Sequence, residues 1–159
     1  MTDHLVLQKA TGTKAPEIHA VQRQAFLPLL KKYGDHPGSP ASESIKTLAE
    51  KIDRPESDCY VFLIDNEIVG SVRITKQNKA TYKISALCVL PRFQNLGIAQ
   101  ESIKRIESIY PHAQKWILDT ILEEDGNCHL YEKLGYVRTG TPHKINEHMT
   151  LIDYEKIIY

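Results

Sequence analysis

The chain divides into segments whose apolar residues repeat with the period of either a helix or a strand. Apolar residues recur every three or four positions after Pro16, before Ile52 and after Gly97, which predicts amphipathic helices. A fourth segment has the length of a short helix and ends at Gly135, and glycine commonly terminates helices. The predicted helices are therefore 16–30, 45–52, 98–109 and 127–134.

Runs rich in β-branched and aromatic residues lie before, between and after these helices. Asp65 and Asn66 form a turn signal between two such runs, which predicts a hairpin. Glycine, proline and serine are dense from Tyr33 to Ser42, so this segment is expected to be a loop. The predicted strands are 5–7, 60–64, 68–74, 81–90, 116–118, 136–139 and 149–152.

The order of these elements favours a mixed α/β or α+β fold. One largely antiparallel central sheet would be flanked by about four helices. A parallel step is expected across the helix that follows Gly97, and a simple doubly wound fold fits poorly. Because the chain has 159 residues and no repeat or linker, residues 1–159 are expected to form a single domain.

Composition narrows the classes of partner. Lysine plus arginine equals aspartate plus glutamate at 20 each, so no general attraction to nucleic acid or anionic lipid is expected. No apolar run reaches the roughly 18 residues of a membrane span, and a soluble, cytoplasmic location is the expectation. The three cysteines are far apart, and the seven histidines show no ligand spacing. Free thiols and no metal are therefore predicted.

The segment from Val89 to Ser102, "VLPRFQNLGIAQES", joins a predicted strand to a predicted helix. A helix N-terminus carries unpaired N–H groups and a partial positive charge, and small residues such as Gly97 and Ala99 leave room for an anion. The pattern matches neither a Walker loop nor a dinucleotide fingerprint. Two simpler interpretations stay open: Gly97 relieves a tight bend, or the turn belongs to a generic phosphate-binding domain.

Two motifs carry a family resemblance. "VLPRFQNLGIAQESI" resembles motif A of the GNAT superfamily of N-acetyltransferases, with Gln94, Gly97 and Ala99 at its signature positions. "NCHLYEKLGY", residues 127–136, resembles motif B, and the order of elements fits the family from Leu5 to Ile152. The resemblance implies an enzyme that moves an acetyl group from acetyl-CoA to a primary amine by direct attack in a ternary complex.

The resemblance also assigns roles to individual residues. The pantetheine arm of acetyl-CoA would pair with the strand backbone, and the pyrophosphate would meet the turn that follows it. Tyr131 would protonate the departing thiolate, and a backbone N–H near Val89 would polarise the carbonyl. The implied cofactor-binding residues are Leu87, Cys88, Val89, Gln94, Asn95, Leu96, Gly97, Ile98, Ala99 and Asn127.

Three of these residues also have a purely structural interpretation. Tyr131 can cap the core with a solvated hydroxyl, although its place in motif B favours the catalytic role. Asn127 can be the N-cap of its helix, which does not exclude a cofactor contact. Cys88 is expected to be a small apolar filler rather than a nucleophile, which favours direct transfer over an acyl-cysteine route.

The general base is the point at which this chain departs from the family pattern. The position that often holds a glutamate, on the strand before motif A, is occupied by Lys83. Substitutes are Asp119 on the following strand, a group in or after the loop at 33–43, or solvent. The loop candidates are Asp35, His36 and Glu43.

The acceptor is expected to be a small-molecule or peptidyl amine. The segments 33–43 and 140–148 would line its side of the site, and Tyr33 adds an aromatic group there. Asp35 or Glu43 would suit a cationic part of it. A non-catalytic acyl-CoA-binding or regulatory module on the same fold is the alternative, and an edge strand near the C-terminus suits a homodimer.

Overall fold

The computed structural model describes residues 2–36 and 39–159, so Pro37 and Gly38 of the predicted loop lie outside the described residues. The strands and helices predicted from the sequence are all present, with somewhat different ends. They are, in chain order, β1 (Leu5–Ala10), α1 (Ala15–Tyr33), α2 (Ile45–Ile52), β2 (Ser57–Ile64), β3 (Glu67–Lys76), β4 (Thr81–Val89), α3 (Ile98–Ile109), β5 (Lys115–Ile121), α4 (Asp125–Lys133), β6 (Val137–Lys144) and β7 (Thr150–Ile157).

The strands form one seven-stranded sheet in the order β1-β2-β3-β4-β5-β7-β6. The pair β4 and β5 is parallel, and the other neighbouring pairs are antiparallel. The crossover from β4 to β5 contains α3, because a parallel connection needs a helix to bring the chain back. The predicted mixed, mostly antiparallel fold with its parallel step is confirmed.

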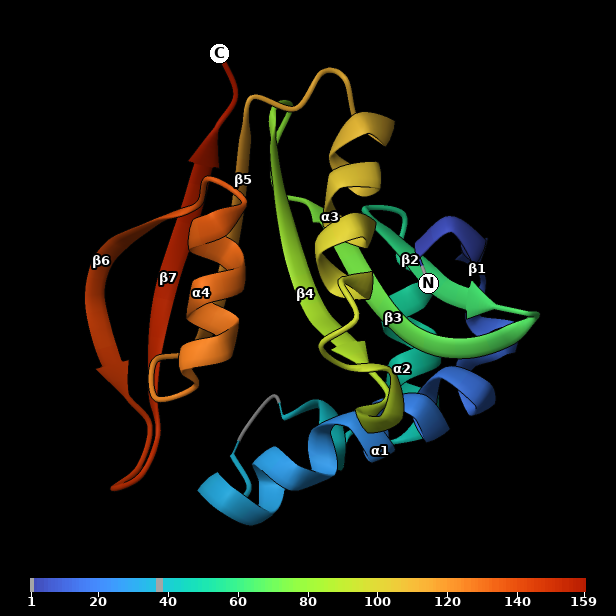
Figure 1. The fold of residues 1–159 in the computed structure, drawn as a ribbon, viewed down its shortest axis with the longest axis horizontal. Helices are drawn as coiled ribbons and strands as arrows, with labels where there is room; N and C mark the ends of the chain where they lie inside the picture. The colour runs from blue at the N-terminus through green and yellow to red at the C-terminus, as the bar shows by residue number, and fades with distance from the viewer. Residues whose placement is uncertain (1, 37–38) are drawn as a thin grey trace.

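Helices cover both faces of the sheet (Figure 1). Side chains of β2 alternate between the faces, so Phe62 packs in the core beneath α3 and α4 while Val61 packs beneath α1 and α2. The larger core includes Ile103 of α3, and the smaller one includes Ile18 of α1. Burial of both faces fixes the strand register, since a slip of one residue would exchange the two sets.

The start of α4 corrects one expectation. The helix begins at Asp125 with Glu124 as its N-cap residue, so Asn127 is the third helical residue and is not the cap. Gly126 hides this start in the sequence, because glycine is a poor helix former. Asn127 and Tyr131 both lie within the helix, one turn apart and on the same side.

The strands β4 and β5 pair over a short distance and then diverge. Their register covers Thr81–Lys83 against Lys115–Ile117, whereas β5 continues alongside β7 as far as Ile121. Beyond Lys83, β4 pairs with β3 alone, and the two parallel strands separate toward the bottom of Figure 1. A bulge marks this region: Ala86 has φ 52° and the register to β3 shifts opposite it.

Candidate active site

A cleft of about 1090 Å³ lies where β4 and β5 diverge. Its walls come from β3, β4 and β5, from the turn before α3, from α4, and from the region between α1 and α2. The cleft gathers most of the residues predicted for the site. Those on its walls are Tyr33, His36, Glu43, Leu87, Cys88, Val89, Gln94, Asn95, Gly97, Ile98, Ala99, Asn127, Asp119 and Tyr131.

Two predicted site residues do not line the cleft. Leu96 is 43% exposed and is not part of the cleft wall. Asp35 lies in a smaller hollow that adjoins the cleft and shares His36 and Glu43 with it, and its carboxylate accepts hydrogen bonds from the Ser42 hydroxyl at 2.6 Å and from the His36 N–H at 2.9 Å. Asp35 is therefore not on the cleft wall itself, and its carboxylate is already hydrogen-bonded.

The end of β4 is held closely against β3. A side chain on Gly70 would bring its Cβ to 2.3 Å from the carbonyl oxygen of Cys88, so glycine is required there. Beyond Lys83, β4 has no partner residues on β5, and the strand edge left without a partner faces the cleft. An extended ligand can pair with this edge in the way that a strand would.

The turn before α3 leaves the helix N-terminus open. Gly97, the N-cap residue, is in the left-handed conformation at φ 82°, and no side chain caps the helix. Apart from Gly97 itself and its two chain neighbours, the nearest described atom to a Cβ at Gly97 would be Thr2 Cγ2, at 3.9 Å. Gln94 closes the turn by donating from Nε2 to the Val89 carbonyl oxygen at 3.0 Å. Unpaired N–H groups and open space suit an anion such as pyrophosphate.

Tyr131 lies on the wall formed by α4, with its ring packed 6.0 Å from the rings of Tyr136 and Tyr154. Burial raises the pKa of the Tyr131 hydroxyl, and the nearby charges of Asp119 and Cys128 raise that pKa further. Within residues 2–36 and 39–159, the hydroxyl makes no hydrogen bond. Tyr131 is thus a protonated donor available to a ligand at neutral pH.

The remaining acidic groups of the cleft are engaged by cations. Asp119 lies 3.8 Å from the Lys83 ammonium, with 44% of its side chain exposed. Glu43 forms an ion pair with Lys51, and its other oxygen lies 3.5 Å from Gln22 Nε2. Neither candidate base is an isolated carboxylate.

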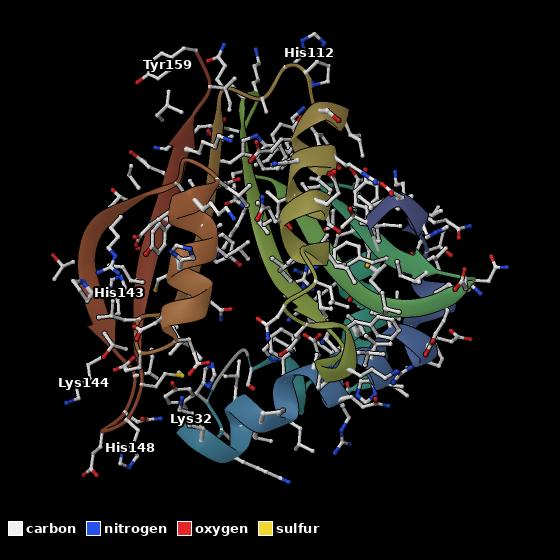
Figure 2. The ribbon with its side chains drawn as sticks, viewed as in Figure 1. Lys32, His112, His143, Lys144, His148 and Tyr159 are labelled. Atoms are coloured by element: carbon white, nitrogen blue, oxygen red, sulfur yellow. The ribbon has the colours of Figure 1, made fainter. Side chains whose placement is uncertain are left out.

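Glu124 is a cleft residue that the sequence interpretation missed. Its carboxylate forms an ion pair with Lys32 at 2.7 Å and accepts a hydrogen bond from the Tyr33 hydroxyl, and these contacts lower its pKa. Asn146, between β6 and β7, donates to the Tyr33 carbonyl oxygen at 2.9 Å. Figure 2 shows Lys32 on the same side of the molecule as Lys144 and His148 of that hairpin. The only sequence signal was the position of Glu124 just ahead of a short helix.

A cysteine and a histidine on the cleft wall, residues that often act as nucleophile or base, have buried reactive atoms. Cys88 is buried, and burial raises the pKa of its thiol to about 11, which makes it a poor nucleophile. The Nδ1 atom of His36 is buried and has no partner among the described residues. Among residues 2–36 and 39–159, no group of three or more metal-ligating side chains occurs. No helix in these ranges has the length and apolarity to cross a membrane.

The fold and the cleft define a class of α/β protein whose sheet opens between two parallel strands. A family model, the acetyltransferase (GNAT) family, matches residues 23–136, which is more than half of the chain. The chain therefore belongs to the GNAT family of acetyltransferases, and the family predicted from the two motifs is confirmed. A direct comparison with curated proteins gives no match.

Solved structures with the same fold include three acetyltransferases. Spermidine N-acetyltransferase from Vibrio cholerae, in complex with CoA and spermine, has a TM-score of 0.77 and 18% identity over 98% of this chain and 96% of its own. The Salmonella typhimurium acetyltransferase that modifies the N-terminal serine of ribosomal protein L7/L12 has a TM-score of 0.76 and 14% identity, over 98% and 96%. A GNAT acetyltransferase from Elizabethkingia anophelis with acetyl-CoA bound has a TM-score of 0.68 and 17% identity over 98% of this chain and 99% of its own.

Proposed function

We propose that the chain transfers an acetyl group from acetyl-CoA to the nitrogen of a primary amine inside the cleft between β4 and β5. The observation that carries this proposal is the position of Tyr131, a protonated donor with no hydrogen-bond partner among the described residues, on the same cleft as the open N-terminus of α3. Membership of the GNAT family and the structures of relatives with CoA or acetyl-CoA bound support it.

Acetyl-CoA is proposed to lie along the free edge of β4. Backbone groups from Leu87 to Val89 would pair with the pantetheine arm, and the turn from Gln94 to Ala99 would hold the pyrophosphate. Asn127, one turn before Tyr131 on α4, would contact the arm from the opposite wall. The ligand would thus bridge the gap that the sheet leaves open. A cytoplasmic location is part of the proposal, because acetyl-CoA must be available.

The transfer needs three groups in one place. The amine nitrogen attacks the thioester carbonyl carbon, whose oxygen is polarised by a backbone N–H near Val89. As the new C–N bond forms and the C–S bond breaks, the electron pair goes to sulfur, and the Tyr131 hydroxyl supplies the proton that converts the thiolate to free CoA. Direct attack is favoured because the one thiol on the cleft wall, Cys88, stays protonated.

Asp119 is the proposed acceptor of the proton that the amine loses. Among the candidates predicted from the sequence, it lies close enough to Tyr131 for its charge to raise the pKa of that hydroxyl. Glu43 is held closely by Lys51, whereas Lys83 lies 3.8 Å from Asp119, and Asp35 lines the adjoining hollow rather than the cleft wall. Asp119 therefore places a carboxylate beside the acid, and a water molecule can carry the proton to it.

The proposal is tested by following release of the free CoA thiol from acetyl-CoA over a panel of primary amines that includes polyamines, amino acids and short peptides. Acceptor-dependent release with at least one amine is expected. Tight CoA binding with no acceptor-dependent release from any member would instead indicate an acyl-CoA-binding module.

A further inference from the structure

Arg73, in the middle of β3, has the most unusual surroundings of any charged residue in the cleft. Its side chain is partly buried and lines the cleft. Within residues 2–36 and 39–159, its guanidinium group makes no ion pair and no side-chain hydrogen bond. Arginine is rarely buried without a partner, because transfer of a charge out of water costs free energy that a partner must offset.

The sheet register places Arg73 on the acceptor side of the site. It pairs with Ser85 of β4, one residue before the bulge at Ala86, and with Cys59 of β2. Paired residues share a face of the sheet, and Cys59 packs in the core beneath α1 and α2. Arg73 therefore projects from the face that is opposite to α3, next to the point where β4 and β5 separate.

The nearest carboxylate is already engaged. Glu43 raises the pKa of Arg73 through its charge, but its oxygens are used by Lys51 and Gln22. Burial has the larger effect and lowers that pKa, while the charge of Arg54 lowers it further. The charge of Glu43 thus does not compensate for the burial of the Arg73 guanidinium.

The other cleft carboxylates do not offer an alternative recognition site for a cation. Asp119 is paired with Lys83, and Glu124 is paired with Lys32. Glu43, which the sequence suggested for a cationic part of the acceptor, is held in an ion pair by Lys51. An acceptor that carries a negative charge would complete the pairing, whereas a polyamine would add a second positive charge beside Arg73.

We infer that Arg73 binds a carboxylate of the acceptor, so that the amine acetylated by this chain is an amino acid or a similar compound bearing both groups. The planar fork of an arginine matches the two oxygens of a carboxylate. With the carboxylate on Arg73, the amine points toward the bulge of β4. This inference rests on the proposed function, because it assigns the acceptor of the same site.

Matched acceptors test the inference. Thiol release is measured with α-, β- and γ-amino acids and with the corresponding amino acid amides, which keep the amine and lose the carboxylate. The wild type is expected to prefer the acids, and Arg73→Gln to raise their KM by about 30-fold without changing the KM for acetyl-CoA. Arg73→Lys should recover only part of the loss, because lysine keeps the charge and loses the fork.

Binding separates this inference from the proposed function. Calorimetry of the CoA-loaded protein with an N-acetylated amino acid measures carboxylate recognition without any turnover. Weaker binding in Arg73→Gln, but not in Arg54→Gln, would support the site even if no amine released thiol. Arg54 is the matched control because it is exposed, lies outside the cleft and alters the charge near Arg73. Equal use of acids and amides, or unchanged binding in Arg73→Gln with a normal melting curve, would overturn the inference while leaving acetyl transfer intact.

Discussion

Tyr131 and Asp119 have contrasting surroundings in the cleft. Tyr131 is enclosed by α4 and its aromatic neighbours, so its hydroxyl stays protonated well above neutral pH. Asp119 is 44% exposed on β5 and lies 3.8 Å from the Lys83 ammonium. In the proposed mechanism Tyr131 donates a proton and Asp119 accepts one, as acid–base catalysis of acetyl transfer requires.

Replacement of Asp119 by asparagine tests its proposed role as the proton acceptor. Asp119→Asn is expected to lower kcat about 30-fold at neutral pH, with partial recovery at higher pH as the amine loses its proton to solvent. The measurement is the pH profile of thiol release with the best acceptor. Asp35→Asn is the matched control, since Asp35 lies outside the cleft. A greater loss in Asp35→Asn than in Asp119→Asn would exchange the two assignments.

Motifs in the sequence pointed to Tyr131 as the proposed acid, but they did not decide among the candidate bases. The choice depends on ion pairs between distant segments, such as the one that joins Lys32 to Glu124. Arg73 was missed because the strand around it reads as a normal alternating strand, although a lone arginine among apolar residues was a usable signal. A single sequence cannot show which charges meet after folding.

In the proposed complex, several elements around the cleft would bind acetyl-CoA together. Pairing of β4 with β5 ends at Lys83, and α3 begins at Ile98 with no capping side chain. The sequence predicted both strands, the helix and the glycine turn. The bulge at Ala86 was not predictable, because alanine at φ 52° carries no local signal and is imposed by the pairing of β3 with β4.

Replacement of Gly97 tests the proposed anion site at the N-terminus of α3. Gly97→Leu is expected to weaken CoA binding at least tenfold, because the side chain would occupy the space in front of the α3 N-terminus. Gly140→Leu is the matched control: Gly140 also has positive φ, at 71°, and an added Cβ would meet Asp153 no closer than 3.9 Å. Calorimetry with CoA measures both variants. Equal losses of affinity would attribute the effect to backbone strain and would remove the anion site.

At the scale of the whole molecule, the sheet joins two buried cores that face opposite layers of helices. Cys59 and Cys88 lie on the same face as α1 and are buried as neutral thiols. At the far edge of the sheet, β6 is exposed along nearly its whole length. Pairing of this edge with a second copy stays a prediction, as does the single-domain organisation of the chain.

The buried thiols predict how the stability of the protein depends on pH. Burial raises the pKa of Cys59 from 9.0 to about 12 and that of Cys88 from 9.0 to about 11. Their contribution is complete below pH 9 and is lost above it, because only the unfolded chain then releases the thiol protons. At about pH 9.5 the loss is on the order of 1 kcal/mol for each thiol.

Urea unfolding at pH 7 and pH 9.5 checks this dependence. The variant carrying Cys59→Ala and Cys88→Ala is expected to be less stable at pH 7, because it loses buried atoms, but to lose less stability on the change to pH 9.5. Tyrosine ionisation affects both proteins equally and cancels from the comparison. An equal decrease in the two proteins would show that the thiols do not set the dependence.

Replacement of Tyr131 by phenylalanine tests the central claim most directly, because it removes one oxygen atom from the wall of the cleft. Tyr131→Phe is expected to lower kcat for acceptor-dependent thiol release about 100-fold, while the Kd for CoA stays within about threefold of wild type. Tyr136→Phe is the matched control, since its hydroxyl donates to Glu107 at 2.8 Å, away from the cleft. An unchanged kcat in Tyr131→Phe, or a loss confined to CoA affinity, would contradict the account.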